Sequence, residues 1–140
     1  MNQEMTIFFL KKHNELYTDA SIRDYIGLGA YVPNYCFLAM SISGKRDVNR
    51  AELAAIYSGL LIAPTRKPLQ VYSDSSTALD LLANKFQHKK FDNLVFAIRN
   101  ISLVKYDGLV QYHKVKGHSG VVGNEIAHNL ARAGALIAPP

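Results

Sequence analysis

The hydrophobic residues in the first third of the chain gather in three short runs that are rich in aromatic and β-branched side chains. These runs cover residues 15–21 (ELYTDAS), 25–34 (YIGLGAYVPN) and 35–44 (YCFLAMSISG). A turn at Pro33-Asn34 follows the second run, and Ser43-Gly44 closes the third. Short runs of this type separated by turns predict an antiparallel meander of three strands.

From Asn49 onward the apolar residues fall at helical spacing, and Pro64 ends the predicted helix. Its apolar positions are Leu53, Ile56, Tyr57, Leu60 and Leu61. Strands are predicted next at residues 69–74 and 109–115, and helices at 76–83, 91–104 and 124–137. In the last helix, the apolar residues on one face are Ile126, Leu130 and Ala133. Because the fourth and fifth strands each follow a helical crossover, this order predicts an α/β fold with a five-stranded mixed sheet and helices on both faces.

Composition changes this picture little. A chain of 140 residues with 49% hydrophobic and 19% charged residues suits one globular domain, which we expect at residues 15–138 after an N-terminal extension at 1–14. Sixteen basic against 11 acidic residues favour a polyanionic partner such as nucleic acid. The single Cys36 cannot form an internal disulfide, and the apolar run at Ile7–Leu10 is too short for a membrane span. We therefore expect a soluble cytoplasmic protein.

Three acids stand where predicted elements meet. Asp19 lies at the exit of the first strand, Glu52 in the first turn of the first helix, and Asp74 at the exit of the fourth strand. If the first and fourth strands are neighbours, all three side chains meet at one edge of the sheet. Converging carboxylates repel one another unless divalent cations neutralise them, and oxygen ligands suit Mg²⁺ or Mn²⁺. The three acids are therefore candidates for a metal site.

Each acid, taken alone, also has a structural explanation. Glu52 stands three residues after Asn49, which is the spacing of a helix capping box. Asp74 precedes a short helix and is a candidate N-cap residue, and Asp19 is a candidate turn residue at a strand end. Taken one at a time, these explanations are the more common ones.

Four segments taken together point further. YTDAS, NRAELAAI, VYSDSSTAL and KVKGHSGVVGNEIAHNLARAGA occur in this order across residues 15–135. They resemble the successive motifs of the type 1 ribonuclease H family, which includes cellular enzymes and the ribonuclease H domains of retroelements. The resemblance implies the ribonuclease H-like fold and an endonuclease that cuts the RNA strand of an RNA–DNA hybrid with two metal ions. It implies no small-molecule cofactor, and we expect a monomer.

The resemblance also assigns roles. Asp19, Glu52 and Asp74 take the places of the first three metal-binding carboxylates, and His118 takes that of a loop histidine that assists proton transfer or product departure. The fourth carboxylate of the family's GNE-x-A-D pattern is replaced by His128. We expect His128 to be a metal ligand that shifts the preference from Mg²⁺ towards Mn²⁺. A decaying site, or a histidine without a role, would give the same sequence.

Contacts with the hybrid follow from the same comparison. Asn49 matches a position that touches the minor groove, whereas Val48 departs from the amide residue frequent there. The remaining residues that we expect to bind nucleic acid are Ser21, Ser76, Lys89, Lys90 and Lys116. Two alternatives stay open: a catalytically silent ribonuclease H-like module that binds nucleic acid or protein, and a nuclease of the same fold that acts on DNA junctions.

Overall fold

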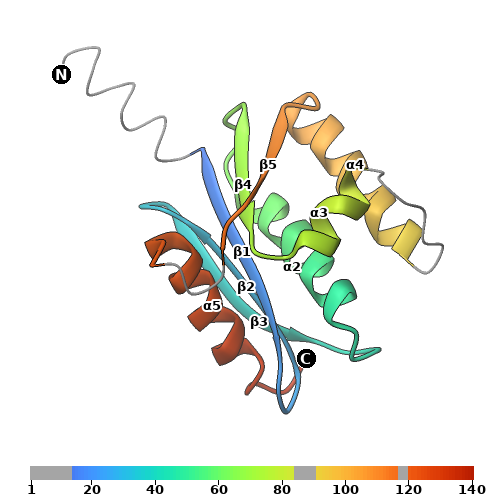
Figure 1. The fold of residues 1–140 in the computed structure, drawn as a ribbon, viewed down its shortest axis with the longest axis vertical. Helices are drawn as coiled ribbons and strands as arrows, with labels where there is room; N and C mark the ends of the chain where they lie inside the picture. Colours follow the sequence, from blue (N-terminus) through green and yellow to red (C-terminus); the bar gives the residue numbers. More distant parts are fainter. Residues whose placement is uncertain (1–13, 84–90, 117–119) are drawn as a thin grey trace.

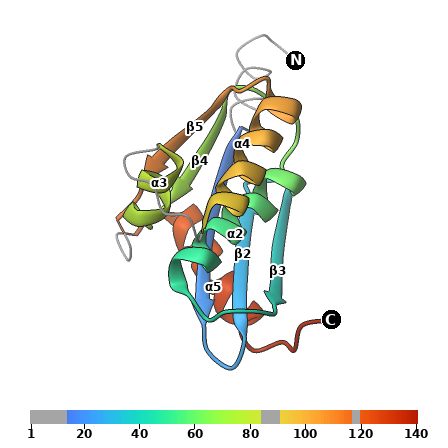
Figure 2. The ribbon, with the colours of Figure 1, turned by 90° about the vertical axis from the view of Figure 1, so that its right-hand side faces the viewer.

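The computed structural model describes residues 14–83, 91–116 and 120–140, and it contains one five-stranded sheet in the order β3-β2-β1-β4-β5. The strands are β1 (Glu15–Ile22), β2 (Ile26–Val32), β3 (Cys36–Ile42), β4 (Leu69–Ser73) and β5 (Val110–Lys114). The first three pair antiparallel, whereas β4 pairs parallel with both β1 and β5. Figure 2 shows β3 and β5 at the two edges. The predicted mixed sheet is confirmed.

Helices cover both faces of this sheet, as the order of elements predicts. They are α2 (Val48–Ile62), α3 (Ser76–Leu82), α4 (Asp92–Tyr106) and α5 (Val122–Gly134). Figure 1 shows α2, α3 and α4 on one side of the sheet and α5 on the other. Alternation along β1 explains the two layers: Leu16 and Thr18 face Gly59 of α2, whereas Tyr17 faces Gly123 of α5. The main apolar core lies between the sheet and α2 with α4.

The packing of α5 differs from the predicted apolar face. Ile126 and Leu130 are only half-buried and Ala133 is exposed. The buried face consists of small residues instead, namely Gly123, Asn124, Ala127, Ala131 and Gly134. A Cβ atom added to Gly29 of β2 would lie 2.2 Å from the carbonyl oxygen of Ala127, so the helix backbone rests almost directly on the strand. Close approach, rather than large apolar side chains, joins α5 to the sheet.

An aromatic contact fixes the start of the same helix. The Tyr17 ring lies where a side chain on Gly123 would be, 2.4 Å from the added Cβ, so only glycine fits there. Tyr17 in turn stacks on Tyr72 of β4 at a centroid distance of 4.8 Å, and Tyr72 stacks on His113 of β5 at 4.9 Å. This row of rings crosses β1, β4 and β5 and holds α5 in register with β1, two residues before Asp19.

No helix within the described ranges is both long and apolar enough to cross a membrane.

Candidate metal centre

Asp19 and Asp74 come together where two parallel strands part. The pairing of β1 with β4 ends at Tyr17 and Tyr72, and Asp74 directly follows the last residue of β4. The sequence predicted that Asp19 lies at the end of its strand. It lies within the strand instead, because β1 continues to Ile22 as the partner of β2. At Asp19, β1 is therefore paired with β2 on one side and is no longer paired with β4 on the other.

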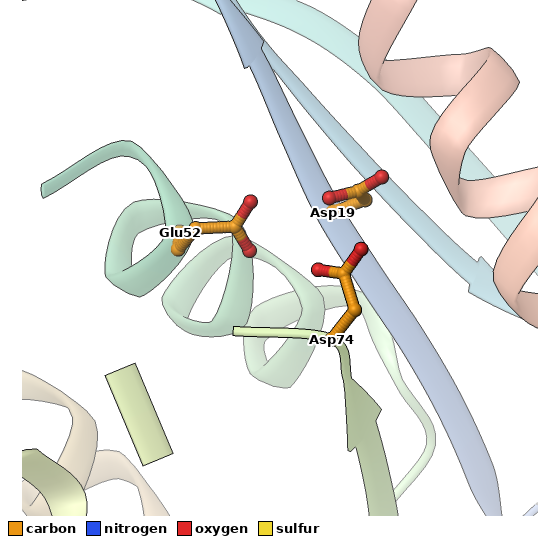
Figure 3. Close-up of side chains that lie close together, drawn as sticks. All are labelled: Asp19, Glu52 and Asp74. Carbon is orange, nitrogen blue, oxygen red and sulfur yellow. The ribbon is translucent and has the colours of Figure 1, made fainter. Parts of the chain in front are cut away.

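Glu52 reaches the same point from α2. Its Oε1 accepts a hydrogen bond from the backbone N–H of Ala20 at 3.1 Å, and the same N–H donates to Asp19 Oδ1 at 2.9 Å. One ligand atom from each of Asp19, Glu52 and Asp74 lies within 4.8 Å of the other two. Figure 3 shows the three carboxylates pointing towards one another from β1, from α2 and from the end of β4. The predicted convergence of these acids is present.

Burial makes this cluster electrostatically costly. Asp19 is 3% exposed and Glu52 is 5% exposed, and Glu52 Oε2 is buried without a hydrogen-bond partner among the described residues. Burial, followed by the charges of Asp19 and Asp74, raises the pKa of Glu52 far above its ordinary value. Burial and Asp19 also raise the pKa of Asp74, although its own backbone hydrogen bond, His128 and Lys114 act in the opposite direction. A cation would remove this strain.

The structural explanations for the acids do not hold. Helix α2 is capped by Asp47, whose side chain accepts hydrogen bonds from the N–H groups of Asn49 and Arg50 at 2.9 and 3.2 Å. The proposed capping box of Asn49 and Glu52 is therefore wrong. Helix α3 is capped by Ser75, which accepts from the Ala78 N–H at 3.1 Å. Neither Glu52 nor Asp74 serves as a cap, so both carboxylates are left to face the cluster.

His128 approaches the cluster from α5. Its Nδ1 lies 2.8 Å from Oδ2 of Asp19, and its side chain is 29% exposed. The close approach of α5 to β2 at Gly29 makes this contact possible, because it brings the helix backbone down onto the sheet beside Asp19. The imidazole is therefore part of the carboxylate cluster rather than a remote surface group.

Of the other predicted site residues, the structure describes Ser21, Asn49, Ser76 and Lys116. Ser21 lies two residues beyond Asp19 on β1, Asn49 lies in the first turn of α2, and Ser76 begins α3 just after Asp74. Lys116 is exposed beyond the end of β5. His118, Lys89 and Lys90 lie outside the described residues.

Sequence reasoning missed two groups that shape the centre. The N–H of Ala20 orients two carboxylates, but a backbone donor leaves no signal in the sequence. Asp47 carried a usable signal, because aspartate is a favoured N-cap residue and stands directly before Val48, the first helical residue.

A mixed sheet in the order found here, with acids gathered where β1 and β4 diverge, defines a ribonuclease H-like α/β protein. The profile of the family described as RNase H matches residues 11–136. A protein named Ribonuclease H from Chlorobium chlorochromatii (strain CaD3) is 29% identical in an alignment that covers 88% of this chain and 95% of that protein.

Solved structures show the same fold. RNase H1 from the halophilic archaeon Halobacterium salinarum NRC-1 matches with a TM-score of 0.69 at 18% identity, over 89% of this chain and 98% of that one. LC11-RNase H1, in complex with an RNA/DNA hybrid, matches with a TM-score of 0.68 at 15% identity, over 85% and 97%. The chain belongs to the ribonuclease H family and is a ribonuclease H enzyme, and this family depends on divalent metal ions.

Proposed function

We propose that this protein hydrolyses the RNA strand of RNA–DNA hybrids at a divalent metal centre formed by Asp19, Glu52, Asp74 and His128. The observation that carries the proposal is the buried Glu52 Oε2, which lacks a hydrogen-bond donor among the described residues and belongs to a cluster of three carboxylates. An unpartnered buried carboxylate oxygen is costly unless a cation or a proton reaches it. A protein without a metal gains nothing from this arrangement.

The donor set fits hard divalent cations. Carboxylate oxygens are the ligands that Mg²⁺ and Mn²⁺ prefer, and all three acids offer an atom to the same small volume. His128 Nδ1 lies 2.8 Å from Asp19 Oδ2, so the imidazole would join these carboxylates as a nitrogen ligand. The residues present are therefore suited to divalent ions.

When bound, two divalent ions supply activation of a water molecule and stabilisation of the leaving oxygen in an in-line displacement at phosphorus. The chain's own residues hold the geometry for this chemistry. The Ala20 N–H donates to Asp19 Oδ1 and to Glu52 Oε1, which leaves Glu52 Oε2 for ligation, while Asp19 Oδ2 faces His128 Nδ1. Because Asp19 lies within a paired strand, its carboxylate keeps its position when substrate binds.

His128 makes this centre different from one with four carboxylates. A neutral imidazole brings no negative charge and offers nitrogen in place of oxygen. Mn²⁺ accepts nitrogen ligands more readily than Mg²⁺ does. We therefore expect cleavage to be faster with Mn²⁺ than with Mg²⁺.

Recognition of the hybrid requires contacts that distinguish RNA from DNA. The 2′-hydroxyl group is the feature that allows this distinction, and polar side chains close to the centre suit it. Asn49, Ser21 and Ser76 each lie within three residues of one of the three acids. Lys116, together with Lys89, Lys90 and His118 outside the described residues, would contact phosphates or assist proton transfer. Binding of an RNA/DNA hybrid by the structurally similar LC11-RNase H1 supports this substrate class.

The test uses an end-labelled RNA–DNA hybrid with Mg²⁺, Mn²⁺ or EDTA in separate reactions. Duplex DNA and single-stranded RNA of the same sequence serve as control substrates. We expect metal-dependent cleavage of the hybrid's RNA strand alone, and its loss in Asp74→Asn but not in Asp24→Asn, which changes an exposed acid of the β1–β2 turn. Equal cleavage of duplex DNA would contradict the proposed specificity, and unchanged activity of Asp74→Asn would contradict the proposed centre.

One observation favours a second candidate function. His128 Nδ1 lies within hydrogen-bonding distance of Asp19 Oδ2, so the imidazole occupies one carboxylate oxygen of the cluster without any metal. In that case the protein would be a silent module that binds hybrids without cutting them. Stable hybrid binding in Mg²⁺ and in Mn²⁺, with no cleavage product, would favour this alternative.

A further inference from the structure

A surface hollow lies between the β1–β2 turn and the last turns of α5. It has a volume of about 270 Å³ and is lined by Arg23, Asn129, Arg132, Ala133 and Leu136. Figure 1 shows the β1–β2 turn and the C-terminal end of α5 at the same end of the molecule. Arg23 and Arg132 are 109 residues apart in the chain, and only the fold brings them to one cavity.

Both arginines are free to bind an anion. Within the described parts of the chain, neither guanidinium group forms a salt bridge with a carboxylate, and both side chains are exposed. Asn129 adds an exposed side-chain amide, which can donate two hydrogen bonds. Arginine presents several N–H donors in a planar fork that matches the oxygen atoms of a phosphate group. The hollow therefore has the chemistry of a phosphate site.

The backbone around the hollow is held in place by bonds that do not use these side chains. The Arg46 guanidinium donates to the carbonyl oxygens of Arg23 and Asp24, which fixes the β1–β2 turn. The Tyr25 N–H donates to the carbonyl oxygen of Ala135 at 2.9 Å, which ties the same turn to the end of α5. The hollow is thus formed before any ligand binds, and replacing Arg23 or Arg132 removes none of these bonds.

The two arginines of the hollow come from the same two segments as Asp19 and His128. Arg23 follows Asp19 by four residues along the chain and comes directly after Ile22, the last residue of β1. Arg132 follows His128 by four residues on α5, so the two side chains lie on one face of the helix about one turn, or roughly 5.4 Å, apart. The hollow therefore lies further along β1 and α5 than Asp19 and His128 do.

We infer that this hollow binds a backbone phosphate of the RNA strand, a short distance along that strand from the phosphate that is cleaved. The inference rests on the proposed function, because the RNA strand is the one whose phosphate must lie at the carboxylates. Contacts to phosphate fix the register of a nucleic acid without reading its bases. Arg23 and Arg132 would hold the RNA strand so that one of its linkages lies over the metal centre.

The first arm of the test measures kinetics on a hybrid with one defined cleavage site. Arg23→Gln, Arg132→Gln and the double variant are compared with Arg66→Gln, a control at a half-buried arginine in the loop between α2 and β4. Losing a phosphate contact that is equally strong in ground and transition states raises KM and leaves kcat unchanged. We expect KM to rise about tenfold for each of the two single variants, and the slope of log KM against log salt to fall by about 1 per arginine. Arg132→Lys should recover part of the loss.

The second arm locates the phosphate. Single linkages near the cleavage site are replaced by neutral methylphosphonates, at 2′-O-methyl nucleotides in the RNA strand or at deoxynucleotides in the DNA strand. For the parent protein, one neutral RNA linkage should weaken binding. For the double arginine variant, the same linkage should have no further effect, because its partner is already missing.

Three results would overturn the inference. The first is a KM for the double variant within twofold of the parent value, with thermal melting that shows an intact fold. That result would mean that Arg23 and Arg132 are solvated surface residues without a phosphate contact. The coupling can instead appear for a DNA linkage, which assigns the hollow to the other strand. If the parent protein cuts no hybrid with either metal, the proposed function itself fails, and the inference fails with it by a different measurement.

Discussion

Replacing Glu52 with glutamine should stabilise the metal-free protein at neutral pH while it abolishes cleavage. In the unfolded chain this carboxyl group has a pKa near 4.5, and burial together with Asp19 and Asp74 raises the pKa in the folded protein above neutrality. At pH 7 the folded protein therefore retains a proton that the unfolded chain has released. Retaining it costs free energy, and a neutral amide does not carry that cost.

The size of the gain follows from the interval between the unfolded pKa and the experimental pH. At pH 7 this interval is roughly 2.5 pH units, which corresponds to at most about 3 kcal/mol at 1.36 kcal/mol per unit. The amide oxygen of glutamine can still accept the Ala20 N–H, so the existing hydrogen bond is kept. The sign also fixes the pH window: the stabilising contribution of protonated Glu52 is fully present below pH 4.5 and is lost as the pH rises towards the folded pKa.

The assay is urea unfolding in EDTA at pH 4.5, 5.5 and 7, for the parent, Glu52→Gln and the exposed control Asp24→Asn. The stabilisation by Glu52→Gln should be close to zero at pH 4.5 and grow with pH, whereas Asp24→Asn should follow the parent. Added Mg²⁺ or Mn²⁺ should stabilise the parent more than the variant, because the variant lacks one ligand. A loss of stability in Glu52→Gln at pH 7, or a gain that does not depend on pH, would refute the electrostatic reasoning.

Further predictions concern the centre and the packing around it. Asp74→Asn should abolish turnover yet keep the fold, and His118→Ala should keep partial activity because water can replace a proton shuttle; single-turnover rates on a hybrid measure both. His128→Asp should raise the Mg²⁺-supported rate, whereas His128→Ala should lower the rate with Mg²⁺ and Mn²⁺, and equal rates for His128→Ala and parent with both ions would show that the imidazole is no ligand. Gly29→Ala should lower the unfolding free energy by at least about 1–3 kcal/mol, because its Cβ atom would lie 2.2 Å from the Ala127 carbonyl oxygen; a melting temperature equal to the parent's would contradict this.

The elements, their order and the family could all be predicted from the residues and their spacing. Residue types and their spacing predicted five strands and four helices, because side-chain period and turn chemistry are local properties. Four motifs in a fixed order also identified Asp19, Glu52 and Asp74 as the acids of interest. For each acid taken alone, the neighbouring residues favoured a cap or a turn over a metal ligand.

The contacts between these residues could not be predicted in this way, because they join segments that are far apart in the chain. Glu52 accepts a hydrogen bond from the N–H of Ala20, 32 residues away, and His128 contacts Asp19, 109 residues away. Both contacts depend on strand order and on which side of the sheet each helix covers. The prediction for the buried face of α5 was wrong for a similar reason. The spacing of apolar residues in a helix describes that helix alone, and it does not show that the strand beneath has glycines in place of side chains. Gly29 lets a face of small residues lie closer to β2 than larger residues could, and that approach brings His128 to the carboxylates.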